Sequence, residues 1–483
     1  MPNIDISNFQ GGISPKPNRG PEGSFKYGYG LDIRGDVDSL TCNQALKKIS
    51  ASTVTDLILC FVPASDGNLY AFGNAGAIYR INSSNVVTKV HTYAGADSVK
   101  QITGAAEYTC YDGANYVPYL FFATAAHLHR IKLSDAAGTW AGNVVEDWKA
   151  FSADDTGWHT IVEAMGDLLI ADGQYLAMVD YESAYNSEAL DIPKPHRIKT
   201  LLPLDQQVLL GSFIRDEVSE GNIWSWDNIA PSWYQRRRVT TDGVNAMLWL
   251  DFILIQAGEQ GSLYSYDGDS VGRFRKLPGT GAFIHPSGMA VRDEIAYMGV
   301  NGDNKVGIYS FGADYRGDTR KLNHDYIIST GHTTNVRIGA VCVYNGQLYA
   351  SWRDTTSGTV YGLDTVDTAN KATGRYESME VPGAGKATKT RLGHIRIACE
   401  PLPAGCTIAV QYRNNNGAWQ DAALGDGTPT MATTGMTEGW FAVDHPEEYG
   451  RWCEVAVTLT PSGNTAPEIY SLDLSLEAVP NNE

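Results

Sequence analysis

Short apolar runs recur in pairs along residues 51–382, and a polar or glycine-containing turn separates the two runs of each pair. The second run of a pair combines an aliphatic residue with an aromatic or a basic one, as in Ile78-Tyr79-Arg80-Ile81. The first and last of these second runs begin 282 residues and six steps apart, which is about 47 residues per step. Seven such runs begin at Ile78, Leu128, Leu176, Ile223, Leu263, Ile308 and Val360.

The run before each of these is apolar at almost every position, which is typical of a strand with both faces covered. Turn residues such as Asp66-Gly67 and Asp172-Gly173 lie next to or between the paired runs, as hairpins require. Repeated small antiparallel sheets of this length predict an all-β fold, a β-propeller of about seven blades over residues 51–382. The preceding runs are Leu69–Ala71, Leu120–Phe122, Leu168–Ile170, Val208–Leu210, Phe252–Leu254, Ile295–Tyr297 and Leu348–Ala350.

Residues 1–50 lie outside this repeat and begin with a segment rich in glycine, proline and asparagine. That segment has too few aliphatic residues to form a core alone. We therefore expect an extended N-terminal arm that lies on the ring or on a neighbouring subunit. Its aromatic residues Phe25, Tyr27 and Tyr29 are the candidates for contacts between subunits.

Residues 383–483 form a third segment, which opens with the linker-like sequence Gly383-Ala-Gly-Lys-Ala387. Alternating apolar and polar positions follow, and they predict a small antiparallel β-sandwich. The expected strands are His394–Cys399, Thr407–Tyr412, Trp440–Val443, Cys453–Leu459 and Glu468–Leu476.

Composition and charge narrow the class of protein. Charged residues make up only 19% of the 483 residues, and the formal net charge of −18 disfavours binding to nucleic acid and to anionic membranes. No apolar run approaches the roughly 18 residues that cross a bilayer, and Met1–Gln10 lacks the pattern of a secretory signal. The seven cysteines are scattered along the chain, so their spacing predicts no disulfide pairing, and we expect them to be small buried residues.

Motifs for chemistry are weak, and we expect no catalytic set, no metal and no cofactor. The stretch around Gly385-Lys386 has Glu380 and Ala387 where a phosphate-binding loop needs glycine and a hydroxyl residue. His127 and His129 would share one face of a strand, but no cysteine or acidic third ligand lies nearby in the sequence. They are interpreted as a hydrogen-bonded blade surface. Acidic turns such as Asp267-Gly-Asp269 leave calcium binding open, with solvated turns favoured.

Two further sets of residues are candidates for binding. Arg236, Arg237 and Arg238 would meet a phosphate group or an acidic partner, although a solvated loop is the favoured explanation given the net charge of −18. Trp419 is a candidate for stacking on a sugar ring, although a buried position in the sandwich core is the favoured explanation.

The order of the parts resembles that of phage tail structural proteins, in particular nozzle or distal-hub proteins. The resemblance rests on the arm sequence Gly23-Ser-Phe-Lys-Tyr-Gly-Tyr-Gly-Leu-Asp32, on the propeller, and on a terminal β-domain from Arg391 to Leu476. It covers the whole chain as architecture, while its individual motifs have low specificity.

This resemblance implies a virion component made in the host cytoplasm. Copies of the chain would form a ring, commonly of six, bind other tail proteins and let phage DNA pass without reading its sequence. An acidic lumen would suit that passage because like charges repel. The alternative is an extracellular propeller that binds or cleaves glycans. A WD-type scaffold is disfavoured because Trp226-Asp227 is a single occurrence rather than a repeated pair.

Overall fold

The structure is a computed structural model. It describes residues 3–35, 39–50, 53–152, 157–214, 220–239, 243–313, 320–382, 389–443 and 450–479. Within these ranges nearly all regular structure is β-strand, and the one helix is the four-residue α1 (Leu133–Ala136). No helix in the described part of the chain is long and apolar enough to cross a membrane.

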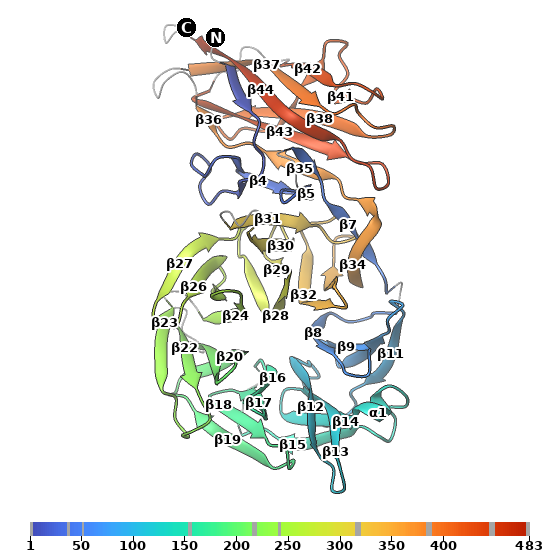
Figure 1. The fold of residues 1–483 in the computed structure, drawn as a ribbon, viewed down its shortest axis with the longest axis vertical. Helices are drawn as coiled ribbons and strands as arrows, with labels where there is room; N and C mark the ends of the chain where they lie inside the picture. The colour runs from blue at the N-terminus through green and yellow to red at the C-terminus, as the bar shows by residue number, and fades with distance from the viewer. Residues whose placement is uncertain are drawn as a thin grey trace. The chain divides into compact units, whose positions relative to one another are not determined.

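Seven four-stranded antiparallel sheets form a seven-bladed β-propeller, as predicted. In Figure 1 these sheets follow one another around a centre, and the first strand of each is nearest to it. The first three blades are β8 (Ile58–Pro63), β9 (Leu69–Gly73), β10 (Ala77–Ile81) and β11 (Val87–Thr92); β12 (Gly104–Tyr111), β13 (Tyr116–Ala123), β14 (His127–Lys132) and β15 (Val145–Ala150); and β16 (Ile161–Ala164), β17 (Asp167–Asp172), β18 (Tyr175–Val179) and β19 (Tyr185–Asp191).

The next three blades have the same order of strands. They are β20 (His196–Leu204), β21 (Gln207–Ile214), β22 (Gly221–Trp226) and β23 (Gln235–Val239); β24 (Val244–Trp249), β25 (Ile253–Ala257), β26 (Ser262–Tyr266) and β27 (Val271–Lys276); and β28 (Phe283–Arg292), β29 (Ile295–Asn301), β30 (Gly307–Gly312) and β31 (Lys321–Tyr326). The seven repeated runs of the sequence are the third strands, and the apolar runs before them are the second strands.

The seventh blade takes its outer strand from the N-terminal segment. It contains β32 (Val336–Tyr344), β33 (Gln347–Asp354) and β34 (Val360–Lys371), and β7 (Gln44–Lys48) pairs with β34 as the fourth strand. Two hydrogen bonds just after β7 continue this pairing, from Ile49 N to Leu363 O (2.9 Å) and from Leu363 N to Ser50 Oγ (3.1 Å).

Apolar side chains from the inner strands pack each blade against the next. Between the first two blades the rings of Phe72 and Phe122 stack with centroids 5.7 Å apart, in a buried cluster that includes Tyr70 and Ile131. Similar clusters join blades 2 and 3, 3 and 4, 4 and 5, and 7 and 1. Full burial of one such side chain contributes roughly 1.5–3 kcal/mol. Burial on both faces therefore accounts for the continuous apolar runs.

The remaining strands form two seven-stranded sheets. One runs β40-β42-β37-β44-β6-β5 with β1 on β44, and the other runs β39-β38-β43-β35-β4 with β36 on β43 and β41 on β38. The strands are β1 (Asn3–Ile6), β4 (Tyr27–Tyr29), β5 (Leu31–Asp32), β6 (Leu40–Cys42), β35 (Gly374–Glu377), β36 (Val381–Pro382), β37 (Lys389–Cys399), β38 (Thr407–Asn414), β39 (Gln420–Asp421), β40 (Ala423–Leu424), β41 (Thr430–Met431), β42 (Glu438–Ala442), β43 (Trp452–Thr460) and β44 (Glu468–Val479); β2 (Gly12–Ile13) and β3 (Ser24–Phe25) pair separately in parallel.

The expectation of an extended arm over residues 1–50 needs correction. Strands β1, β4, β5 and β6 are members of the two sandwich sheets, and β7 belongs to the seventh blade. The segment has too few apolar residues for a core of its own, but Leu31, Leu40 and Cys42 are buried in the core that it shares with C-terminal strands. The Sγ atom of Cys42, for example, lies 3.6 Å from Leu459 O on the other sheet.

The division of the chain also differs from the predicted boundaries at 50 and 382. Contacts group residues 1–47, 308–329 and 366–483 in one compact unit, and residues 48–307 and 330–365 in another. Strands β35 and β36, which lie inside the range 51–382 predicted for the propeller, belong to a sandwich sheet. The linker-like residues 383–387 lie outside the described residues. All seven cysteines are free thiols, and six of them are buried.

Candidate functional site

One face of the propeller carries the turns between the first and second strands of the blades, because these strands repeat in the same direction around the ring. Two pockets open beside such turns. One lies at blades 1 to 3 with a volume of about 740 Å³, and the other lies at blades 4 and 5 with a volume of about 660 Å³.

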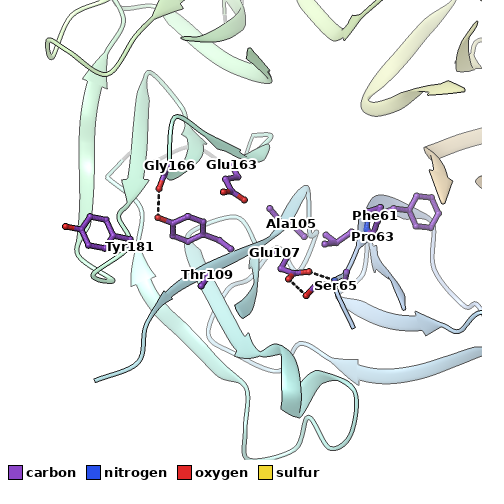
Figure 2. Close-up of a pocket in the computed structure, with 13 residues that line it drawn as sticks. Phe61, Pro63, Ser65, Ala105, Glu107, Thr109, Glu163, Gly166 and Tyr181 are labelled. Carbon is purple, nitrogen blue, oxygen red and sulfur yellow. Dashed lines mark hydrogen bonds between the residues drawn. The ribbon is translucent and has the colours of Figure 1, made fainter. Parts of the chain in front are cut away.

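The first pocket is lined by the ends of β8 and β12 and by turns of the third blade (Figure 2). The Glu107 carboxylate accepts hydrogen bonds from the backbone N (2.7 Å) and the hydroxyl (2.5 Å) of Ser65. The Tyr108 hydroxyl donates to Gly166 O (2.8 Å), and burial raises the pKa of Tyr108 well above its ordinary value. Glu163 is exposed at the same pocket. The lining thus offers carboxylate acceptors to a ligand that carries hydroxyl or amino groups.

The second pocket combines an exposed indole with acidic and amide groups. Trp249 ends β24 with 52% of its surface exposed, and Asp205, Asp251 and Gln207 lie around the pocket. At its edge the Tyr266 hydroxyl donates to Gly268 O (2.9 Å). An indole with hydrogen-bond acceptors beside it can bind a sugar, since the face of the indole packs against pyranose C–H groups and the acceptors take hydrogen bonds from sugar hydroxyls. Sequence reasoning did not single out Trp249, because nothing along the chain distinguishes an exposed strand end from a core position.

Among the described residues, one group of three side chains that could bind a metal ion lies at the second blade. Asp97, in the connection between β11 and β12, is 2.5 Å through Oδ1 from His127 Nδ1 on β14. Asp147 on β15 places its Oδ1 atom 3.7 Å from the same nitrogen. Although burial opposes its charge, hydrogen bonds from Thr124, Ala126 and His127 hold the pKa of Asp97 below its ordinary value.

A second imidazole, His129, fixes the hydrogen-bond directions behind this cluster. Its Nδ1 atom accepts from Asp147 N (2.8 Å), so its Nε2 atom carries the proton toward Thr124 Oγ1 (2.7 Å). Thr124 in turn donates to Asp97. Burial lowers the pKa of His129 to about 4, which keeps the ring neutral near neutral pH. The two histidines share one face as predicted, with ring centroids 6.4 Å apart. The acidic groups Asp97 and Asp147 lie 30 and 20 residues from His127 along the chain, so no local pattern pointed to them.

The three consecutive arginines occupy an outer strand, β23, rather than a loop. Arg236 donates to Glu220 and to Asn222 Oδ1 (2.9 Å), and Arg238 lies 3.8 Å from Glu220 with 63% of its side chain exposed. Arg237 alternates to the other face and donates to Asp269 O (3.0 Å). Part of their charge is therefore compensated within the chain, and a contact with a phosphate or an acidic partner stays a prediction.

The aromatic residues of the N-terminal segment have partners within the same compact unit. Phe25 and Tyr27 are buried, and the hydroxyl of Tyr27 is 3.0 Å from His324 Nδ1 on β31. The rings of Tyr29 and His324 meet with centroids 6.2 Å apart. These contacts leave the half-buried Tyr29 as the more accessible candidate for a subunit contact.

Trp419 is half-buried and lies under two guanidinium groups. The Cζ atoms of Arg413 and Arg375 are 4.1 Å and 5.3 Å from its ring centroid. Because cations already cover the indole, stacking on a sugar is less favourable here than at Trp249. The acidic turn at Asp267 is a hydrogen-bonded turn, since its Oδ1 atom accepts from Asp269 N (3.0 Å) and Ser270 N (2.8 Å).

The solved structures that resemble this chain share little sequence with it. The Cps50 (Swd1) β-propeller domain of Myceliophteria thermophila is 10% identical, with a TM-score of 0.45, over 66% of this chain and 98% of that one. The WD40 repeats of RRP9 are 11% identical, with a TM-score of 0.46, over 68% of this chain and 99% of that one. The extracellular domain of the putative one-component system BT4673 of B. thetaiotaomicron is 14% identical, with a TM-score of 0.45, over 75% of this chain and 44% of that one. No known family profile and no curated protein sequence matches the chain.

Proposed function

We propose that the chain is a structural component of a phage tail, of the nozzle or distal-hub kind, and that it acts by assembly rather than by catalysis. One observation carries this proposal. The N-terminal segment supplies the last strand of the seventh blade and four strands of the two sandwich sheets. The two ends of the chain are therefore joined in common sheets, as β1 and β44 illustrate.

Such closure supports a mechanical role. A blade completed by a distant strand cannot peel from its end without breaking contacts elsewhere in the chain, and a ring leaves few strand edges open to wrong pairing. Both properties oppose local opening, and a long-lived particle depends on slow unfolding. A net charge of −18 further suits a ring through which DNA passes without adhering.

The proposal places copies of the chain in a ring, commonly of six, bound to other tail proteins in the virion after synthesis in the host cytoplasm. Mass spectrometry of purified virions and electron microscopy of the purified protein test it. We expect the chain among the virion proteins and ring-shaped particles in the micrographs. Monomeric particles from a protein absent from the virion would overturn the proposal.

A second candidate function, glycan binding at the end of a tail or outside the cell, is favoured by the pocket at Trp249. Glycan-array binding by the whole protein tests this function, with Trp249→Ala as the decisive variant. Trp440→Ala is a matched control, because both indoles are 52% exposed but Trp440 lies on the sandwich strand β42. Binding that is absent in the unmodified protein, or lost equally in both variants, would count against a sugar site at Trp249.

A further inference from the structure

Three side chains from separate elements bring metal-binding atoms together on the second blade. Asp97 comes from the connection before β12, His127 begins β14, and Asp147 lies on β15. One ligand atom of each lies within 4.8 Å of the other two, and this is the one such group among the described residues. Ligands at about 2.0–2.2 Å from a tetrahedral Zn²⁺ ion are themselves about 3–3.5 Å apart. The separations of 2.5 Å and 3.7 Å around His127 Nδ1 lie on either side of that spacing, so the hydrogen-bonded pair of His127 and Asp97 would move apart when an ion enters.

The two carboxylates are already held in place by the surrounding chain. The second oxygen of Asp97 accepts from Ala126 N (3.0 Å), and that of Asp147 accepts from Ala96 N (3.1 Å). The Tyr93 hydroxyl donates to Asp147 Oδ1 (2.6 Å). Hydrogen bonds of this kind orient metal ligands and reduce the movement that binding requires. Asp147 also has a φ of 52°, a left-handed conformation that fixes the direction of its side chain.

The cluster is accessible from solvent on one side. The side chain of Asp97 is 2% exposed, whereas those of His127 and Asp147 are 25% and 28% exposed. An ion can therefore enter past His127, and water can occupy a fourth position. One imidazole with two carboxylates is a donor set for a borderline divalent ion, because Ca²⁺ and Mg²⁺ prefer ligand sets made only of oxygen.

We propose that Asp97, His127 and Asp147 bind one Zn²⁺ ion per chain. As His127 Nδ1 donates its lone pair to the ion, the proton that it shares with Asp97 leaves Nδ1 and the ring takes up a proton at Nε2 from the solvent, so the imidazole stays neutral and no net proton is released. No group is oxidised or reduced in this step. The bound ion would link the connection between the first two blades to the outer strand β15 and so stabilise that part of the ring.

The test uses the full chain after chelation with EDTA and removal of the chelator. Isothermal titration with Zn²⁺ should give about one equivalent bound per chain, and Co²⁺ should give the visible bands of a tetrahedral site. Titration with Ca²⁺ or Mg²⁺ should give no comparable binding. A chain that binds no Zn²⁺, or that binds Ca²⁺ equally well, would overturn the proposal, and neither measurement needs a variant.

Two variants locate the ion. His127→Ala should lose the bound equivalent, whereas His332→Ala should keep it. His332 is a matched control because its Nδ1 atom pairs with Asp354 at 2.6 Å without a second carboxylate in the group. Binding that survives in His127→Ala would place the ion elsewhere and refute the assignment. If His127→Ala does not fold, Asp147→Asn keeps the size of the side chain and should show the same loss.

Discussion

At the scale of single residues, the charges of the sandwich show how a buried ion is stabilised. Glu454 on β43 is fully buried, and two cations face its carboxylate. Lys26 Nζ lies 2.8 Å from one oxygen and Arg413 Nη2 lies 2.6 Å from the other. Lys26 comes from the N-terminal segment, so this cluster also links the two ends of the chain.

Replacement of Glu454 by glutamine should lower the free energy of unfolding by about 1–3 kcal/mol. The neutral amide leaves both cations without their buried partner, although the cations are 22% and 16% exposed and can partly hydrate. Urea unfolding followed by tryptophan fluorescence measures the change. Glu477→Gln is the control, because its pair with Arg391 is about a third exposed and should matter by less than about 1 kcal/mol. Equal losses in the two variants would contradict the role of burial.

His285 on β28 should make stability depend on pH. Burial, and then the nearby charges of Lys199 and Arg337, lower its pKa to about 3. Unfolded histidine binds a proton near pH 6.5 while the folded side chain stays neutral, so stability is lost as the pH falls from about 6.5 toward 3. The gap in stability between the native protein and His285→Gln should narrow by about 1–2 kcal/mol from pH 7 to pH 5.

Urea titrations of both proteins at several pH values measure this gap. Above pH 7 the gap should be constant, because neither state of His285 takes up a proton there. A gap that stays constant down to pH 5 would show that His285 is charged in the folded protein.

At the scale of elements, the seventh blade depends on pairing between β34 and the N-terminal segment. Ile49→Pro removes the donor to Leu363 O and should cost about 2–3 kcal/mol. Hydrogen exchange of peptides from β34 should accelerate. Lys47→Ala, two residues earlier in β7, is a control, because that ammonium is 49% exposed and lies 3.6 Å from Asp367. Unchanged exchange in Ile49→Pro would mean that the pairing contributes little.

Elements with strong periodicity could be predicted from the sequence, and short ones could not. The second and third strands of every blade are buried against neighbours on both faces, so they appear as continuous apolar runs such as Leu168–Ile170. Strands β5 and β6 contain two and three residues, which is too few for an alternating pattern. Strand β6 pairs with β44, which lies more than 400 residues away along the chain, and no local signal encodes that pairing.

The same reasoning explains what could be predicted of the candidate sites. The spacing of His127 and His129 indicated a shared face, because strand side chains alternate. Asp97 and Asp147 reach that face through a connection and a neighbouring strand, so only the folded chain brings them close. Exposure likewise depends on the fold, which is why Trp249 was missed and Trp419 was selected.

At the scale of the whole molecule, the charge of −18 should oppose the proposed assembly into a ring, because identical copies repel one another. Screening shortens the range of that repulsion from about 10 Å at 0.1 M salt to about 3 Å at 1 M salt. We expect the oligomeric fraction, measured by analytical ultracentrifugation at constant protein concentration, to rise with sodium chloride. Sucrose at matched osmolality controls for excluded volume and should have a smaller effect. Dissociation at high salt would instead show that ion pairs of opposite sign hold the copies together, and the net charge would then not govern assembly.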